Sequence, residues 1–242
     1  MIGTPVLVAC SHGTRGSLGR RTVGALVAAV AAARPGLDVE AAFVDVQPPE
    51  VGDVVRRITA GGRGAVVVPL LLSGGYHVHV DIGRATAREQ AVSAGALGPD
   101  PRLAQVLLDR LRQAGARPGD AVVLAAAGSS DERSGADVEQ VAVAVRAQWA
   151  GPVVVGYGAS ARPSVAEAVA QARGLTGGRV VVAAYLLAPG FFHDRLAEAG
   201  ADAVTGPLAV DGSGTIDPRL VAVVLDRYDA AVSQLVPAPA RR

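Results

Sequence analysis

The chain has 242 residues, of which 50% are hydrophobic and 19% are charged, a composition that suffices for a full core and excludes a disordered protein. With 23 Lys and Arg against 22 Asp and Glu, the formal net charge is +1, so the balance offers neither a basic face for nucleic acid nor an acidic tail. The single cysteine, Cys10, excludes an internal disulfide and any zinc site or iron–sulfur cluster built from the chain's own cysteines.

Short apolar runs alternate with longer Ala-rich segments that carry Arg and Glu at helical spacing, which is typical of an α/β fold. Six of the runs are mainly apolar rather than alternating, which predicts buried parallel strands at residues 6–9, 39–44, 65–70, 121–126, 152–157 and 179–185. Helices are predicted at residues 17–33, 49–60, 80–94, 102–114, 132–149, 163–173, 194–199 and 218–235.

The beginning of the chain has no basic segment ahead of its apolar run, which meets His12 and Arg15 before it reaches the length of a signal peptide. No later stretch offers about 18 uninterrupted apolar residues, the length that a membrane span needs. We therefore expect a cytoplasmic protein that is neither secreted nor inserted in a membrane.

An internal repeat relates the two parts of the chain. VLVACSHGTR at residues 6–15 matches VVLAAAGSSDER at 122–133, and AAFVDVQPPEVGDVV at 41–55 matches VVVGYGASARPSVAEAV at 153–169. PLLLSGGYHVHVDI at 69–82 matches AYLLAPGFFHDRL at 184–196, and GPDPRLAQVLLDRL at 98–111 matches IDPRLVAVVLDRY at 216–228. The repeat predicts two tandem, doubly wound parallel-sheet halves that arose by duplication.

We place the halves at residues 1–116 and 117–236, followed by a flexible tail at 237–242. In open parallel sheets, ligands bind beyond the carboxyl ends of the strands. The loops at residues 10–16, 45–49, 72–79, 128–130, 158–162 and 188–193 follow predicted strands, so we expect them to surround a cleft between the halves.

Two histidines follow neighbouring predicted strands. His12 comes directly after the first strand, and His77 follows the third through the residues SGGY. Both imidazoles should therefore project into the mouth of one cleft, where they could build a metal site or a proton-transfer site. The alternative is that both are solvated or packing histidines.

The repeat suggests that the two halves have different roles. The second half has Gly128 where the first has His12, and Phe191–Phe192 where the first has Tyr76–His77. One half would then carry metal chemistry while the other forms a wall of the cleft. His193 could add a ligand from across the cleft, or it is a residue of the rim.

Asp45 ends the second predicted strand and could help to hold a divalent cation or accept protons. Its alternative role is to cap the turn before Pro48 and Pro49. Neither a dinucleotide fingerprint, a P-loop nor a serine-hydrolase elbow is present. Guanidinium groups suit carboxylate ligands, and five arginines are candidates for this role: Arg15, Arg84, Arg133 and Arg162 lie near the cleft loops, and Arg195 lies further on.

At SHGTR and PLLLSGGYHVHVDI the chain resembles the sirohydrochlorin chelatase family, the class II tetrapyrrole metal chelatases. The shared pattern is His12–Gly13 after the first strand, Pro49 at a helix start, and a Gly-x-His-x-x-x-Asp-Ile segment at residues 75–82. The resemblance covers nearly the whole chain in a duplicated form. It implies two flavodoxin-like halves that enclose a tetrapyrrole cleft, with Asp45 in place of an expected glutamate.

The resemblance also implies an activity, the insertion of a divalent metal into sirohydrochlorin, with Fe²⁺ favoured for sirohaem and Co²⁺ for cobalamin as the alternative. The metal is a substrate, and no organic cofactor is needed. His12 and His77 are the implied catalytic pair, and they bind the metal together with Asp45. Candidate residues for binding the tetrapyrrole are Ser11, Arg15, Gly75, Tyr76, His79, Phe191, Phe192 and His193.

Two other functions remain open at this point. A tetrapyrrole- or metal-binding carrier would keep the cleft without accelerating insertion, and a sugar- or nucleotide-binding α/β protein would ignore tetrapyrroles. We expect a monomer, because one chain already contains both walls of the cleft.

Overall fold

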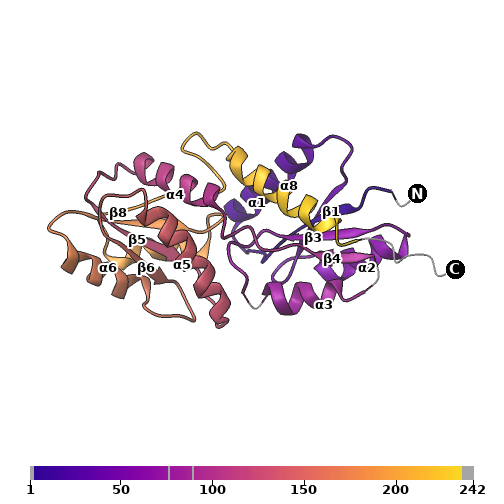
Figure 1. Ribbon diagram of the computed structural model, residues 1–242, viewed down its shortest axis with the longest axis horizontal. Helices are drawn as coiled ribbons and strands as arrows, with labels where there is room; N and C mark the ends of the chain where they lie inside the picture. Colours follow the sequence, from indigo (N-terminus) through magenta and orange to yellow (C-terminus); the bar gives the residue numbers. More distant parts are fainter. Residues whose placement is uncertain (1–2, 76, 89, 236–242) are drawn as a thin grey trace.

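The computed structural model describes residues 3–75, 77–88 and 90–235, with the backbone alone at residues 77–79. Two four-stranded parallel sheets carry the fold, one ordered β2-β1-β3-β4 and one β6-β5-β7-β8 (Figure 1). The first contains β1 (Val6–Ser11), β2 (Val39–Phe43), β3 (Ala65–Pro69) and β4 (Ala91–Ser93). The second contains β5 (Ala121–Ala126), β6 (Val153–Tyr157), β7 (Val180–Tyr185) and β8 (Ala203–Val204).

Helices cover both faces of each sheet. They are α1 (Ser17–Ala33), α2 (Val51–Ala60), α3 (Gly83–Thr86), α4 (Pro101–Gln113), α5 (Glu132–Arg146), α6 (Val165–Leu175), α7 (Phe191–Leu196) and α8 (Pro218–Val232). A π-helical segment, His77–Ile82, precedes α3, and a 3₁₀ turn, Ala197–Ala199, follows α7. None of these helices is both long and apolar enough to cross a membrane, in the part of the chain that the structure describes.

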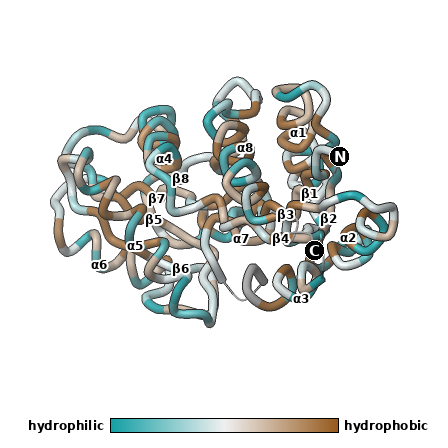
Figure 2. Tube along the Cα trace, turned by 45° about the vertical axis from the view of Figure 1, so that its right-hand side comes forward, coloured by the Kyte–Doolittle hydropathy of each residue, from teal (hydrophilic) through white to brown (hydrophobic). Residues whose placement is uncertain are grey.

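The four inner strands, β1, β3, β5 and β7, are almost entirely apolar because successive side chains enter two different cores. In β1, Leu7 and Ala9 pack into the core that contains α1 and α8, whereas Val8 and Cys10 pack with α2 and α3 on the opposite face. The second sheet is covered in the same way by α4 and α5 on one face and by α6 and α7 on the other. Figure 2 shows the hydrophobic colour concentrated in the interior strands and the hydrophilic colour on many outer turns.

The predicted fold class is confirmed, but the prediction of one helix at residues 80–94 is wrong. A π-helical segment and the short α3 occupy its beginning, and β4 occupies its end. Two of the edge strands, β4 and β8, were not predicted from the sequence because they are three and two residues long, too short for any hydrophobic period to show. The predicted tail at 237–242 lies outside the described residues.

The internal repeat is reproduced in three dimensions, with a register that differs by one residue at the first loop. Gly13 has φ +94° and Gly128 has φ +90°. A Cβ at Gly13 would lie 2.2 Å from the carbonyl oxygen of Asp45, and one at Gly128 would lie 1.9 Å from that of Ala159. Gly13 therefore corresponds to Gly128, and Ala127, not Gly128, is the counterpart of His12. The run AAAGSS contains only small residues, so sequence alone offered no landmark for this register.

The last helix of each repeat packs on the other half. Helix α4 packs against α5 and β7 of the second half, whereas α8 packs against α1 and β3 of the first, as Figure 1 shows. The predicted boundary near residue 116 separates the two repeats along the chain, but in space α4 packs with the second half and α8 with the first. This exchange holds the two sheets together around one continuous core.

Ion pairs related by the repeat join the two exchanged helices. Arg102 of α4 contacts Asp226 of α8 at 2.6 Å, and Arg219 of α8 contacts Asp109 of α4 at 2.7 Å. These pairs are partly exposed, so each adds little stability by itself. Because each helix supplies one arginine and one aspartate, the two pairs together fix how α4 and α8 are aligned along each other.

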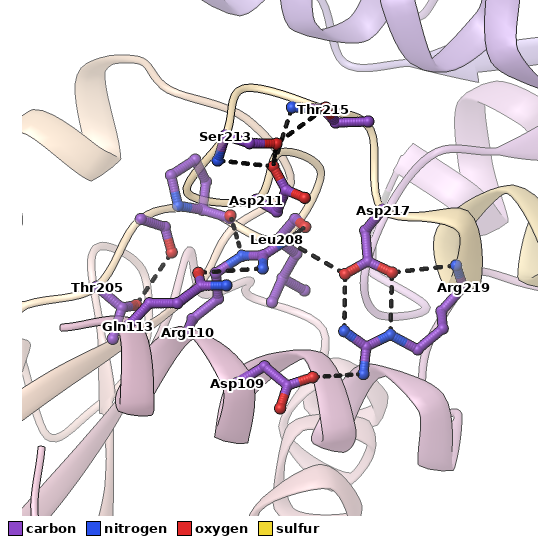
Figure 3. Close-up of polar contacts among 12 residues, drawn as sticks. Asp109, Arg110, Gln113, Thr205, Leu208, Asp211, Ser213, Thr215, Asp217 and Arg219 are labelled. Atoms are coloured by element: carbon purple, nitrogen blue, oxygen red, sulfur yellow. Dashed lines mark hydrogen bonds and ion pairs between the residues drawn. The ribbon is translucent and has the colours of Figure 1, made fainter. Parts of the chain in front are cut away.

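A buried arginine completes this junction (Figure 3). The guanidinium of Arg110 in α4 donates to the carbonyl oxygens of Pro207 and Leu208 and lies 3.3 Å from the carboxylate of Asp217. The Arg110 and Asp217 side chains are 3% and 4% exposed. Burial lowers the pKa of Arg110. Burial alone would raise the pKa of Asp217, but hydrogen bonds from Arg219 and the nearby guanidinium charges leave it below its usual range.

Candidate functional site

A cavity of about 790 Å³ opens between the two halves at the carboxyl ends of β1, β3, β5 and β7. The loops that follow these four strands line it, so both halves contribute walls. Most of the lining is small or apolar, with few charged groups. The cavity lies where the loops of a parallel sheet are expected to bind a ligand.

His12 lines the cavity directly after β1 and is exposed. The loop that carries it is fastened to the loop after β2, because the amide of Asp45 donates to the carbonyl oxygen of His12 at 3.1 Å. The amide of Val44 likewise donates to the carbonyl oxygen of Ser11 at 3.0 Å. The backbone under the imidazole is therefore fixed while the ring faces the cavity.

The structure describes less of the second predicted histidine. The backbone of His77 begins the π-helical segment that follows β3, and β3 pairs with β1 so that Pro69 lies opposite Cys10. His77 and His12 therefore follow neighbouring strands, as predicted. The side chains of His77 and His79, and all of Tyr76, lie outside the described residues. Among the side chains that are described, no three His, Cys, Asp or Glu form a metal-binding group.

Asp45 makes a turn-capping hydrogen bond. Its side chain is exposed, and its Oδ1 accepts a hydrogen bond from the amide of Val46 at 2.7 Å. The cavity is lined by Val46 and Gln47 of this loop, whereas the Asp45 carboxylate does not contribute. Of the two roles that the sequence left open, these contacts favour the cap.

Helix α7 forms the opposite wall. Phe191 and Phe192 are 67% and 38% exposed, and their rings meet edge to face with centroids 5.5 Å apart. His193 lines the same wall, but its Nε2 donates to the carbonyl oxygen of Thr205 at 3.0 Å. Only Nδ1 of His193 is then left to act as a ligand atom. This wall therefore offers aromatic faces and one anchored imidazole.

Arg15 is the one of the five candidate arginines that lines the cavity, within the described part of the chain. Its side chain is exposed at the loop between β1 and α1. Three of the others make local contacts with carboxylates, in the pairs Arg133–Asp131, Arg162–Glu167 and Arg195–Glu198. Arg195 also lies 5.6 Å from the centroid of the Phe191 ring.

Contacts between the halves hold the cavity in shape. The Oγ atoms of Ser73 and Ser134 are 2.8 Å apart, and the amide of Gly74 donates to Asp137 at 2.7 Å. Gly75, a predicted binding residue, packs here, since a Cβ on it would lie 3.0 Å from Oγ of Ser129. These polar partners were missed by the sequence analysis because each contact joins residues more than 50 positions apart along the chain.

A buried tyrosine makes a further contact of this kind. The hydroxyl of Tyr185 in β7 donates to the carbonyl oxygen of Leu72 at 2.8 Å. Burial raises the pKa of this phenol, so it stays a neutral donor. Gly98 lies against the pair, since a Cβ there would be 2.2 Å from the Tyr185 hydroxyl and 2.4 Å from the Leu72 oxygen. No side chain larger than glycine's fits at residue 98 without displacing this bond.

Ser11 lines the cavity with a buried hydroxyl whose Oγ has no hydrogen-bond partner among the described residues. Its counterpart in the repeat is Ala126, because Ser11 pairs with Phe43 as Ala126 pairs with Tyr157. An unpaired buried hydroxyl costs stability of about 1–3 kcal/mol. The second half has alanine at the equivalent position, so the repeated frame accommodates a residue there without a hydroxyl.

We expect Ser11→Ala to raise the thermal midpoint by at least about 2–4 °C, the shift that corresponds to about 1 kcal/mol, because the variant removes that unpaired hydroxyl. Differential scanning calorimetry measures the change. The control is Ala126→Ser, which adds a hydroxyl at the equivalent buried position and should lower the midpoint. A midpoint that falls on Ser11→Ala would mean that the hydroxyl is paired in solution.

The chain matches a family model over both halves and resembles solved structures of the same architecture. A family model described as CbiX matches residues 6–114 and 121–231. SirB from Bacillus subtilis with Fe³⁺ is 19% identical, with a TM-score of 0.76 over 96% of this chain and 95% of that one. The sirohydrochlorin chelatase SirB from B. subtilis subspecies spizizenii, in complex with cobalt, is 18% identical, with a TM-score of 0.74 over 93% and 94%.

A third structure, CbiX described as the terminal enzyme for biosynthesis of siroheme in denitrifying bacteria, is 17% identical. Its TM-score is 0.65 over 93% of this chain and 98% of that one. A search of curated protein sequences found no match. At these identities the solved structures establish a shared fold of two parallel-sheet halves.

Proposed function

The chain belongs to the CbiX family, and from this premise we propose that it is a sirohydrochlorin chelatase that inserts a divalent metal into the tetrapyrrole. The observation that carries the proposal is the unequal pair of cavity walls. The repeat builds both walls on one frame, yet His12 lines one wall where Ala127 lines the other, and α7 adds Phe191 and Phe192 to the opposite side. One wall suits metal chemistry and the other suits a flat apolar ring.

The cavity suits a tetrapyrrole. Its volume of about 790 Å³ lies in the upper part of the range of about 300–1,000 Å³ that is usual for small-molecule sites. The small and apolar lining can accept the ring faces, and the exposed Phe191 and Phe192 offer aromatic contacts. Arg15 lies at the lining, where its guanidinium can pair with a peripheral carboxylate.

Metal insertion makes two chemical demands. The ring must be held in a bent shape so that pyrrole lone pairs meet the metal, and two pyrrole N–H protons must leave. Imidazole meets the second demand because it accepts protons, and it can also present the metal because it binds divalent ions. We propose that His12 and His77 present the metal and accept these protons, while Asp45 stabilises the loop that carries His12.

The direct test is insertion by the purified chain. Sirohydrochlorin is mixed with the metal, and the change in its absorbance is followed with and without protein. A rate above the spontaneous one supports the proposal. Binding without a faster rate would indicate a carrier, and absence of binding would indicate an α/β protein for another ligand.

We propose Fe²⁺ as the metal, with Co²⁺ as the alternative. Imidazole accepts both ions, so the ligand type does not choose between them. The test is anaerobic insertion of each metal at equal free concentration, followed by complementation of a strain that lacks sirohaem synthesis. Ready insertion of Co²⁺ without complementation would overturn the choice of iron but would still support the proposal that the protein is a chelatase.

We also propose that the protein acts as a monomer. Residues from both halves of a single chain line the cavity, so no second copy is needed to complete it. Sedimentation equilibrium at the concentration used for activity measures the molecular mass. A mass twice that of the chain would contradict this proposal.

A further inference from the structure

Val46 occupies an unfavourable backbone conformation at the edge of the cavity. Its φ is +67°, and the amide of Gln47 donates across it to the carbonyl oxygen of Asp45 at 2.7 Å. This is a γ-turn with a positive φ at its centre, the rarer and strained form. A positive φ is least suited to β-branched residues such as valine, because their side chains crowd the backbone.

The surrounding loops hold this turn in place. The side chain of Asp45 accepts from the amide of Val46 at 2.7 Å, and the side chain of Gln47 accepts from the amide of Thr14 at 2.7 Å. Beneath the turn, a Cβ at Gly13 would lie 2.2 Å from the Asp45 oxygen and 3.3 Å from Cβ of Val46. The turn therefore packs directly on the loop that carries His12.

The side chain at this turn is apolar and accessible. Val46 is 41% exposed and lines the cavity. In the repeat its counterpart is Ser160, which has φ +58°. The backbone conformation therefore belongs to the repeated frame, whereas the isopropyl group is particular to the wall that carries His12. Strain of this kind persists where the surrounding structure imposes it and often marks a functional position.

We propose that Val46 is a substrate-contact residue against which one face of the tetrapyrrole is seated beside His12. This inference rests on the proposed function. An isopropyl group suits the apolar face of the ring and not its peripheral carboxylates. Because the turn is fastened at Asp45, Gln47 and Gly13, the contact is rigid and sets the distance between the ring and the imidazole.

The test uses Val46→Ala and Val46→Gly in the full chain. Both remove the methyl groups, so kcat/KM for sirohydrochlorin should fall by about 3- to 10-fold, and the Kd for sirohydrochlorin without metal should rise by a similar factor. The KM for the metal should not change, because His12 stays in place. Val46→Gly should in addition raise the thermal midpoint by about 2–4 °C, because glycine adopts a positive φ readily, and Val46→Ala should raise it by less, because alanine loses only the crowding of the branched side chain.

The control is Val143→Ala, which removes the same methyl groups from an exposed valine of α5 that lies away from the cavity. It should leave all four quantities unchanged. The inference is overturned if the wild-type protein inserts metal and both Val46 variants keep its kcat/KM and Kd. It is also overturned if the KM for the metal rises in parallel, since that would indicate general damage to the His12 loop. If the wild-type chain binds sirohydrochlorin but does not accelerate insertion, the proposed function fails while the Kd comparison still tests Val46.

Discussion

The variant His12→Ala is expected to lower the rate of metal insertion by at least about 100-fold, the scale of effect that a positioned proton acceptor provides. The fold should survive, because His12 is exposed on a loop and its backbone hydrogen bond with Asp45 does not involve the imidazole. Initial rates of insertion measure the loss, and the thermal midpoint verifies the fold. We expect the same result for His77→Ala.

His193→Ala is the matched control, because it removes an imidazole from the opposite wall of the same cavity. Its Nε2 is already bonded to the Thr205 carbonyl oxygen, so its loss should have a milder effect on the rate than the loss of His12. Two results would show that the metal-handling wall has been assigned wrongly. One is insertion at the wild-type rate by both His12→Ala and His77→Ala, and the other is a larger loss in His193→Ala than in either.

The largest expected effect on stability belongs to Arg110→Met, which should lower the free energy of unfolding by about 2–4 kcal/mol. The substitution keeps an apolar stem of similar length but removes one of the two guanidinium partners of the buried Asp217 carboxylate, which keeps Arg219. It also removes the donors to the Pro207 and Leu208 carbonyl oxygens. These contacts tie α4 to the second half, as Figure 3 shows. Urea unfolding followed by circular dichroism measures the loss.

The repeat supplies the control for this substitution. Arg227 of α8 likewise donates to the Ala96 and Leu97 carbonyl oxygens and lies 3.6 Å from Asp100. Its side chain is 27% exposed, against 3% for Arg110, so water can replace part of what it loses. Arg227→Met should therefore cost about 1–2 kcal/mol. An equal or larger loss for Arg227→Met would show that burial of the pair is not what makes Arg110 important.

The class of fold could be predicted from the sequence because its signal is local. The apolar run at residues 65–70 predicts a buried strand from its own side chains. The Ala-rich segment at residues 17–33 predicts a covering helix in the same way. The structure places β3 and α1 at nearly the same bounds. The duplication was also visible, because matching segments keep their order along the chain.

The position of His12 was predictable for the same reason. A residue that directly follows a buried parallel strand must emerge at the carboxyl edge of the sheet, where the cavity lies. The role of Asp45 was less accessible. A carboxylate after a strand suits a metal ligand or a turn cap equally well, and the hydrogen bond to the amide of Val46 was needed to favour the cap.

Tertiary structure alone decided the features that depend on contacts between distant residues. Local sequence patterns do not predict which sheet α4 or α8 packs against. They also do not predict the hydrogen bond between Tyr185 and Leu72 or the equivalence of Gly13 and Gly128. The strained turn at Val46 could not be predicted from the sequence either, because valine by itself disfavours a positive φ. Such a residue holds its conformation only because the neighbouring loops impose it. Thus the sequence determined, from local periodicity, two α/β halves and the strand end that carries His12, whereas packing between the halves determined the shape of the cavity.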